Sequence, residues 1–408
     1  MRRTYGKPPG HWDLADSYSD IYHDAVHCGD LISVRGQVDL DTKGNVLNPG
    51  NLMVQARNVA AHIRTVVAEF GVGLEAVTRL IAYYANDGSV DEGEFLATVG
   101  AAFGSGPGPA VTAVPLPHLA LPGLAVEIDA DAMLGQDGSP LPRTYSTGRG
   151  AGPLPKPFSH AVRCGQMIFV SGQMACDASG VTRHPGDIIA QSDVIMKNIA
   201  HILGEFGATV DDAVKLRRYF VAQGATADWQ AGVTAVARHF GDPGPVATEV
   251  PVQRLLPDGT MVKIDLIAML GTDGSRLPRR HVGPDAHWSW PVHLPYAHGV
   301  QCGDLFFVGA QPPLTRDGKV VSPADVAAQT KASMDNVVSV LADFGLSTKD
   351  VVRINAFYKG SDAQSDLFAN VGMRNRYFRH PGPASTGVPV PSLPLPETIE
   401  VLAMPPEA

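Results

Sequence analysis

A carboxylate stands near the end of each of three similar apolar segments in this chain of 408 residues. Asp129 lies in "VEIDADAML", Asp265 in "VKIDLIAML" and Glu400 in "IEVLAMP". A carboxylate can act as a general acid or base, and burial favours this role by raising the pKa of the group. The alternative is a strand carboxylate that is bonded to the backbone or to a nearby cation. Proton transfer is therefore the first chemistry that these residues predict.

The second of the three segments carries further charges. Residues two apart on a strand share a face, so Lys263 lies on the face of Asp265, and Glu249 lies on the face of Ala247. Arg217 adds a cation in the stretch "VKLRRYFVA", at the place where the similar stretch "VRINAFYKG" has Asn355. A buried lysine among carboxylates could serve as a base or a binding cation, and a structural ion pair explains it equally well.

Three other stretches that resemble one another each open on an aromatic residue, at Tyr22, Phe158 and Tyr296. His160 and His298 follow two residues later, where the first of these stretches has Asp24. A histidine near a carboxylate can shuttle protons at neutral pH, although a lone histidine on a strand is more often a packing residue. Arg35 precedes a Gly-Gln pair and could meet a substrate anion or form a salt bridge to a linker acid.

These residues belong to three copies of one unit. The strands "VHCGDLISVRGQ", "VRCGQMIFVSGQ" and "VQCGDLFFVGAQ" end at Gln37, Gln173 and Gln311, which are 136 and 138 residues apart. The Pro-Gly-Pro stretches at Pro107, Pro243 and Pro381 have the same spacing. Such self-similarity indicates an internal repeat, and a unit of this length is a small domain rather than a solenoid element.

The pattern within each repeat predicts the order ββαβαββ. Asn51, Asp187 and Asp325 are expected to cap the first helix of each repeat. This order places both helices on one face of a sheet and leaves the other face uncovered. Three such sheets can bury those faces against one another. We therefore predict an α+β fold in which the repeats form an intramolecular pseudo-trimer, with a central β-barrel and the helices outside.

The repeats resemble the RidA/YjgF superfamily, whose chorismate-mutase-like units form homotrimers. The resemblance rests on Tyr-x-x-Ala-Val at Tyr22, Val-Ser-Gly-Gln ending at Gln173, Pro-Ala-x-Thr at Pro109 and Val-Glu-Ile-Asp at Val126. It implies an N-terminal arm at 1–18, repeats at 19–134, 157–270 and 292–408, and linkers at 135–156 and 271–291.

The resemblance also bears on the site. In the deaminating members of the superfamily, an arginine after Pro-Ala holds the substrate carboxylate, which suits the bidentate geometry of a guanidinium. That position is occupied here by Val111, Ala247 and Ser385. None of these side chains can hold a carboxylate, so the substrate stays open. In the deaminases, the acid of the last strand handles a water or a proton, and it matches Asp129, Asp265 and Glu400.

We therefore expect a hydrolase of the deaminase type, acting on an imine, enamine or related small metabolite at a cleft between repeats. The catalytic candidates are Asp129, Asp265, Glu400 and Glu249. The substrate-binding candidates are Tyr22, Arg35, His160, Arg217, Lys263, Tyr296, His298, Asn355 and Ser385. One cleft is expected to be competent, built from the second or the third repeat. The alternatives are a cyclic-amide ring-opening hydrolase, a chorismatase-like lyase, and a non-catalytic pseudo-trimer that binds a small ligand.

Composition limits the partners. The chain has 32 basic and 41 acidic residues, a formal charge of −9, which disfavours nucleic acids and anionic membranes. No apolar run reaches the roughly 18 residues of a membrane span. Three of the four cysteines recur at one strand position, so we expect buried structural thiols. We predict a cytoplasmic monomer without cofactor or metal, in which further association stays open.

Overall fold

Each repeat folds into the predicted ββαβαββ unit in the computed structural model, which describes residues 3–12, 14, 21–148, 150–222, 226–283, 288–289, 292–360, 364–390 and 397–406. The first repeat contains β2 (Ala25–Cys28), β3 (Leu31–Gln37), α1 (Leu52–Ala68), β4 (Val77–Ala85), α2 (Glu92–Gly100), β5 (Ala110–Leu116) and β6 (Val126–Met133). The second contains β8 (Ala161–Cys164), β9 (Met167–Gln173), α3 (Ile188–Gly204), β10 (Ala213–Val221), α4 (Thr226–Ala237), β11 (Gly244–Val252) and β12 (Val262–Met269). The third contains β15 (Gly299–Cys302), β16 (Leu305–Gln311), α5 (Val326–Asp343), β17 (Val351–Lys359), α6 (Gln364–Arg374), β18 (Ala384–Val390) and β19 (Thr398–Ala403).

The predicted caps begin the first helix of each repeat. Asn51 accepts a hydrogen bond from the backbone N–H of Val54, Asp187 accepts from Ile189 and Ala190, and Asp325 accepts from Ala328. These bonds satisfy backbone donors that have no partner within the helix. The predictions for these helix starts are confirmed. Short 3-10 turns lie at Leu74–Ala76, Ala101–Phe103, Val210–Asp212, Thr348–Asp350 and Asn375–Tyr377.

The chain before each repeat adds a strand to the sheet of that repeat. The strand β1 (Arg3–Gly6) pairs with β2, β7 (Arg143–Tyr145) pairs with β8, and β13 (Arg279–Val282) pairs with β15, all antiparallel. The first sheet has the order β1-β2-β3-β6-β4-β5, and the third sheet has the equivalent order. Both linkers therefore do more than connect repeats, because each extends the edge of the next sheet.

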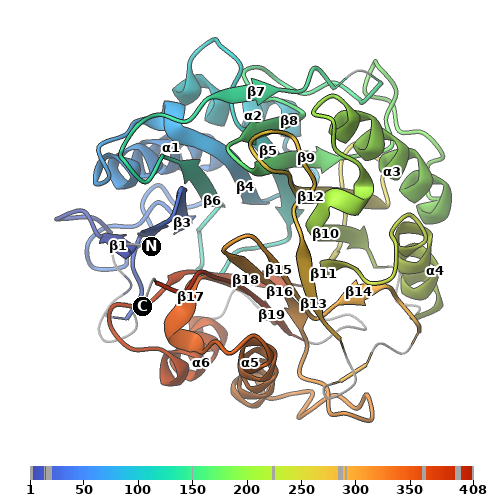
Figure 1. Cartoon of the computed structure of the whole chain (residues 1–408). Helices are drawn as coiled ribbons and strands as arrows, with labels where there is room; N and C mark the ends of the chain where they lie inside the picture. Colours follow the sequence, from blue (N-terminus) through green and yellow to red (C-terminus); the bar gives the residue numbers. More distant parts are fainter. Residues whose placement is uncertain are drawn as a thin grey trace.

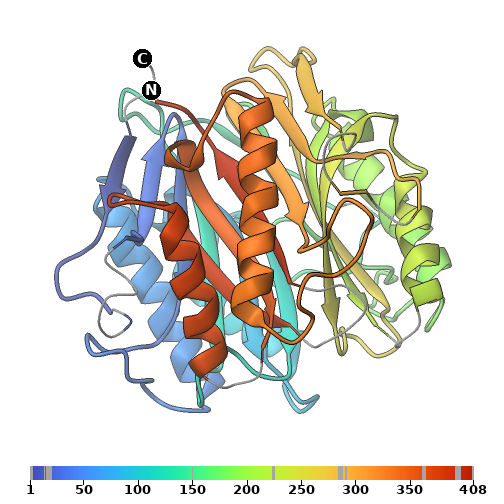
Figure 2. The same cartoon turned by 90° about the horizontal axis from the view of Figure 1, so that it is seen from below.

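The three sheets face one another around a common centre, and the helices lie on the outside (Figure 1). Figure 2 shows the helices of the third repeat, α5 and α6, running along the outer face of their sheet. Across the described residues, the ladders form three sheets rather than one continuous barrel ladder. The predicted pseudo-trimeric arrangement of three ββαβαββ units is confirmed.

Neighbouring repeats meet at three equivalent seams, each marked by a parallel bridge. His23 pairs with Ala384 at the 3/1 seam, and Ser159 pairs with Ala110 at the 1/2 seam. At the 2/3 seam, the short strand β14 (Tyr296–Ala297) joins the second sheet, and Ala297 pairs with Val246. The first strands of one repeat thus meet the fourth strand of the preceding repeat.

An apolar cluster is shared by all three repeats and contains the repeated cysteines. Cys28, Cys164 and Cys302 are each fully buried in it, beside residues such as Phe169 and Phe307. Their prediction as buried thiols is confirmed. No helix in the described part of the chain is long and apolar enough to cross a membrane.

Candidate active site at the seam between the third and first repeats

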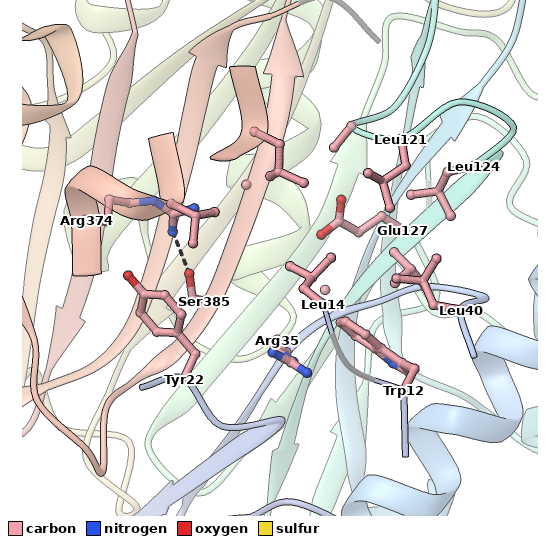
Figure 3. Close-up of a pocket in the computed structure, with 16 residues that line it drawn as sticks. Trp12, Leu14, Tyr22, Arg35, Leu40, Leu121, Leu124, Glu127, Arg374 and Ser385 are labelled. Carbon is pink, nitrogen blue, oxygen red and sulfur yellow. Dashed lines mark hydrogen bonds between the residues drawn. The ribbon is translucent and has the colours of Figure 1, made fainter. Parts of the chain in front are cut away.

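A cavity of about 60 Å³ lies at the 3/1 seam, between β18 of the third repeat and β3 and β6 of the first. Figure 3 shows that Arg374 and Ser385 face it from one side, while Glu127 faces it from the other. Trp12 and Leu14 contribute from the chain before the first repeat. The remaining lining residues are Tyr22, Arg35, Gly36, Val38, Leu40, Ala120, Leu121, Leu124, Leu367, Val371 and Gly387. The cavity thus combines an apolar wall with a few charged groups, which is typical of a small-molecule site.

Glu127 is the carboxylate of this cavity. It lies on β6, directly opposite Tyr83 of β4 in the antiparallel ladder, and only 7% of its surface is exposed. Burial raises the pKa of Glu127 to about 8, with a further increase from Asp129, while Arg35 and Arg374 act in the opposite direction. The side chain lies over Gly36, where a Cβ would overlap the carboxylate. A group with this pKa exchanges protons near neutral pH, as a general acid or base requires.

Arg374 is one of the two arginines that line the cavity, and it comes from the last turn of α6. Its Nε donates to Asn370 Oδ1 over 2.8 Å, and its Nη1 donates to Ser385 Oγ over 2.5 Å. Its guanidinium carbon lies 5.8 Å from the ring centre of Tyr22. The side chain is buried, and within the described residues its hydrogen-bond partners, Asn370 and Ser385, are both neutral. A buried guanidinium of this kind is well suited to bind an anionic ligand.

A buried polar network holds Arg374 in place. Asn370 Nδ2 donates to Glu397 Oε1 over 2.5 Å and to Thr330 Oγ1 over 2.9 Å. Thr330 Oγ1 in turn lies 2.9 Å from both oxygens of Glu397. Burial raises the pKa of Glu397 to about 8, so this carboxyl group is mostly protonated at neutral pH. The network therefore fixes the orientation of Asn370 while placing little negative charge near Arg374.

Tyr22 and Arg35, both predicted as substrate-binding residues, do reach the cavity. Among the residues that the structure describes, the phenol oxygen of Tyr22 has no hydrogen-bond partner, and burial raises the pKa of Tyr22 to about 12. Arg35 Nε donates to Asp24 Oδ1 over 2.8 Å, and its guanidinium stacks on Trp12 at 4.2 Å. Arg35 is thus neutralised by Asp24 within the same repeat, and Arg374 is the cation that is left for a ligand.

The structure places Asp129, Asp265 and Glu400 between the sheets, outside the cavity lining. Glu400 pairs with Arg217, and Lys215 Nζ lies 2.8 Å from it. Burial alone would raise the pKa of Glu400, but these two cations hold it well below its usual range. Catalytic roles for these three acids stay predictions, but their geometry favours a structural ion network.

Asp129 and Asp265 differ within this network. Arg353 lies 2.7 Å from Asp129, and Asn355 Nδ2 donates to Asp129 over 2.8 Å. Burial raises the pKa of Asp265, partly offset by Arg217 and Arg79. The predicted residues Asn355 and Arg217 therefore lie with the interior acids and do not reach the cavity.

The 1/2 seam has a lysine in place of the cavity glutamate. Lys263 lies opposite Tyr219 on β10, as Glu127 lies opposite Tyr83 on β4. Its Nζ donates to Glu92 Oε1 over 3.0 Å and to the carbonyl oxygen of Ala113 over 2.7 Å.

A wider hollow of about 790 Å³ lies beside the pair of Lys263 and Glu92. Its charged side chains already have partners, because Glu92 binds Lys263 and Arg254 binds Asp258. His160, the other candidate of this seam, has a pKa that burial lowers.

Buried side chains of the 2/3 seam pair with one another. Arg218 Nε donates to Glu249 Oε2 over 2.7 Å beside Tyr296, and both charged groups are buried. His298 Nδ1 lies 3.3 Å from Gln311 Oε1, which also accepts from the indole N–H of Trp288. The predicted residues of the third repeat are thus divided among three places: Tyr296 and His298 here, Ser385 at the 3/1 cavity, and Asn355 with Glu400 in the interior.

Two charged residues of the cavity were not identified from the sequence. Glu127 could have been found, because it lies two residues before Asp129 and shares its face of the strand. Arg374 gives no such signal, because it reaches the site from a helix on another repeat. No group of three or more His, Cys, Asp or Glu side chains that could hold a metal ion occurs in the described part of the chain.

Comparison with known proteins places this chain in a family. The family model described as "Endoribonuclease L-PSP" matches residues 16–134, 153–270 and 290–404. A RutC family protein of Pyrococcus abyssi is 32% identical over 112 residues, which cover 28% of this chain and 85% of the relative. A 2-iminobutanoate/2-iminopropanoate deaminase of Escherichia coli is 34% identical over 113 residues, which cover 27% and 85%. A chorismatase crystal structure covers 81% of this chain and 93% of its own, with a TM-score of 0.51 and 14% identity, which shows similarity of fold.

Proposed function

Because the chain belongs to the Endoribonuclease L-PSP family, which includes the RidA/YjgF proteins, we propose that it is a RidA-like small-molecule enzyme. It hydrolyses the C=N bond of a small imine, or of the enamine in equilibrium with it, at the 3/1 cavity. The substrate carries a carboxylate, which Arg374 binds. The similarity to an imine deaminase supports the reaction class, and the cavity supports the assignment of residues.

The observation that carries the proposal is that Glu127 and Arg374 line the same cavity from opposite sides. The two groups come from different repeats, and burial leaves Glu127 with a pKa of about 8. A buried carboxyl group that is ready to exchange protons, opposite a buried cation without an ion pair among the described residues, is the arrangement that an anionic substrate undergoing proton transfer needs.

Glu127 performs the proton transfers in the proposed mechanism. Its protonated form donates a proton to the imine nitrogen and thereby makes the carbon more electrophilic. The resulting carboxylate then takes a proton from the water that attacks this carbon. Glu127 passes this proton to the carbinolamine nitrogen and recovers one from the hydroxyl group as ammonia leaves, so that imine and water give a carbonyl compound and ammonia. General acid–base assistance of this kind typically contributes about 10²–10⁴-fold to the rate.

The apolar side chains of the cavity contact the part of the substrate that lies away from its carboxylate. Leu40, Leu121 and Leu124 face the cavity, together with Trp12 from the N-terminal arm. These side chains favour a substrate whose remaining group is aliphatic, because burying apolar surface on both partners stabilises the complex. They also exclude water that is not needed for the reaction.

The proposal is tested with 2-iminobutanoate generated in the assay from its amino acid by an oxidase. Wild-type protein should accelerate the appearance of the 2-oxo acid above the spontaneous rate, and Glu127→Gln should remove the acceleration while the protein stays folded. A thermal shift with 2-oxobutanoate but no acceleration with any imino acid would instead favour a ligand-binding protein. Equal rates for wild type and Glu127→Gln would refute the acid–base role.

A further inference from the structure

The 2/3 seam and the 3/1 seam differ at one strand position. Glu249 lies opposite Arg218 in the parallel ladder of β10 and β11, and Gly387 lies opposite Ala356 in the ladder of β17 and β18. Each of the two residues stands three positions after the residue that forms the bridge across its seam, Val246 or Ala384. Glu249 and Gly387 are therefore structurally equivalent.

Both seams bring an arginine to a buried tyrosine. At the 3/1 seam, Arg374 lies over the ring of Tyr22. At the 2/3 seam, Arg218 and Glu249 both lie close enough to Tyr296 to influence its pKa, which burial raises far above its ordinary value. Within the described residues, neither phenol oxygen has a hydrogen-bond partner.

The two arginines come from different elements, and the helix residue beside each of them differs accordingly. Gly232 on α4 and Asn370 on α6 are 138 residues apart and equivalent in the repeat. A Cβ on Gly232 would lie 2.8 Å from Arg218 Nη1, so the glycine leaves room for an arginine from the strand. In the third repeat, the side chain of Asn370 occupies the equivalent space and accepts a hydrogen bond from Arg374.

Only one of these two arginines has a carboxylate partner among the described residues. Arg218 and Glu249 form a buried ion pair at the 2/3 seam. Arg374 Nη2 lies 3.0 Å from the place where a Cβ of Gly387 would stand, so a side chain at this position would contact the guanidinium. Gly387 has no such side chain, and it lines the 3/1 cavity.

We propose that the 2/3 seam is a self-occupied form of the ligand site. At the 3/1 seam, the carboxylate of a ligand lies above Gly387, between Arg374 and Tyr22. At the 2/3 seam, the side chain of Glu249 provides the equivalent carboxylate. A buried guanidinium is costly without an anion, so removal of Glu249 exposes a latent site for a small carboxylate at Arg218. The inference rests on the proposed function only in assuming that the ligand of Arg374 is a carboxylate.

The test is rescue of stability by acetate, which matches the end of the deleted side chain. Glu249→Ala should lower the Tm by several degrees, and millimolar acetate should recover most of this loss, whereas chloride at equal ionic strength should not. The same acetate should shift the Tm of wild-type protein less. The double variant Arg218→Met/Glu249→Ala should respond to acetate no more than wild-type protein does, because the cation of the 2/3 seam is gone while the 3/1 cavity is unchanged.

An acetate response of Glu249→Ala equal to that of wild type would overturn the proposal. If Glu249→Ala does not fold alone, its refolding yield with and without acetate becomes the measurement, and equal yields would have the same meaning. Neither readout involves turnover, so a protein that proves inactive on imines can still pass this test.

The converse variant probes the 3/1 cavity. Gly387→Glu should place a carboxylate beside Arg374, as Glu249 lies beside Arg218, and should leave the Tm unchanged or higher. The variant should lose the thermal shift that 2-oxobutanoate gives wild-type protein. Retention of this shift would show that the ligand carboxylate does not lie above Gly387. The matched control is Gly204→Glu at the exposed end of α3, where a Cβ meets open space, and this variant should keep the shift.

Discussion

Arg374 on α6 donates a hydrogen bond to Ser385 on β18, and this bond brings a guanidinium to the wall of the 3/1 cavity. Ser385 stands where the deaminating members of the RidA/YjgF superfamily carry their arginine. The cation is therefore absent from the strand but present in the cavity, because a neighbouring helix supplies it. A group that can bind a carboxylate thus reaches the same seam from another element.

Replacing Arg374 should weaken substrate binding. Arg374→Met removes a buried charge-assisted hydrogen bond to the substrate, and such bonds contribute about 1.5–3 kcal/mol, or roughly 10–150-fold. We expect KM to rise by about this factor with a smaller change in kcat. Arg376→Met, two residues further on at an exposed site, is the matched control and should behave as wild type. An unchanged KM in Arg374→Met would contradict the assignment.

Asn370 should act as a positioning residue. Asn370→Ala removes the acceptor of Arg374 Nε and leaves Glu397 and Thr330 without this partner. We expect KM for a carboxylate substrate to rise while kcat/KM keeps its pH profile, because Glu127 is untouched. Loss of stability with an unchanged KM would point to a purely structural role instead.

Activity should fall as the pH rises through about 8. Glu127 donates the first proton in the proposed mechanism, and its pKa of about 8 sets the pH above which this proton is gone. The measurement is kcat/KM between pH 6 and pH 10, taken as a ratio to the spontaneous rate at each pH (a range chosen to span about two units either side of that pKa). A flat profile across this interval would exclude Glu127 as the acid.

The same pKa shift predicts a stability change. The folded state holds the proton of Glu127 up to about pH 8, whereas the unfolded chain releases it near the ordinary value of 4.5. Wild-type protein therefore loses stability from this group as the pH rises from about 4.5 to 8. Glu127→Gln should remove this loss, so its Tm should exceed that of wild type by more at pH 8 than at pH 5. Parallel Tm curves would contradict a raised pKa.

Glu400 distinguishes the catalytic from the structural interpretation of the interior acids. Glu400→Gln leaves Arg217 and Lys215 without their carboxylate, and breaking one side of a buried pair typically costs about 3–5 kcal/mol. We expect a lower denaturation midpoint and near-normal activity per folded molecule at a temperature where the variant is folded. Lost activity with unchanged stability would support Glu400 as a catalytic residue.

The repeat pattern alone determined the order of elements in each unit. Apolar segments such as "MIFV", the caps at Asn51, Asp187 and Asp325, and the regular spacing of Gln37, Gln173 and Gln311 are local features, and local features predict strands, helix starts and copy number. The uncovered sheet faces then required three units to pack together, so the pseudo-trimer followed from the burial of apolar surface.

Only the tertiary structure decided which charged residues share a site. The sequence groups residues by repeat, but the folded chain brings residues of different repeats together. Glu127 and Arg374 line one cavity, whereas Glu400 pairs with Arg217 in the interior. Strand alternation says which residues share a face, but not which part of that face opens to a cavity and which lies between sheets. The position of a side chain depends on contacts between residues more than 100 positions apart, such as Thr386 with Asp129. Local sequence patterns do not predict such contacts.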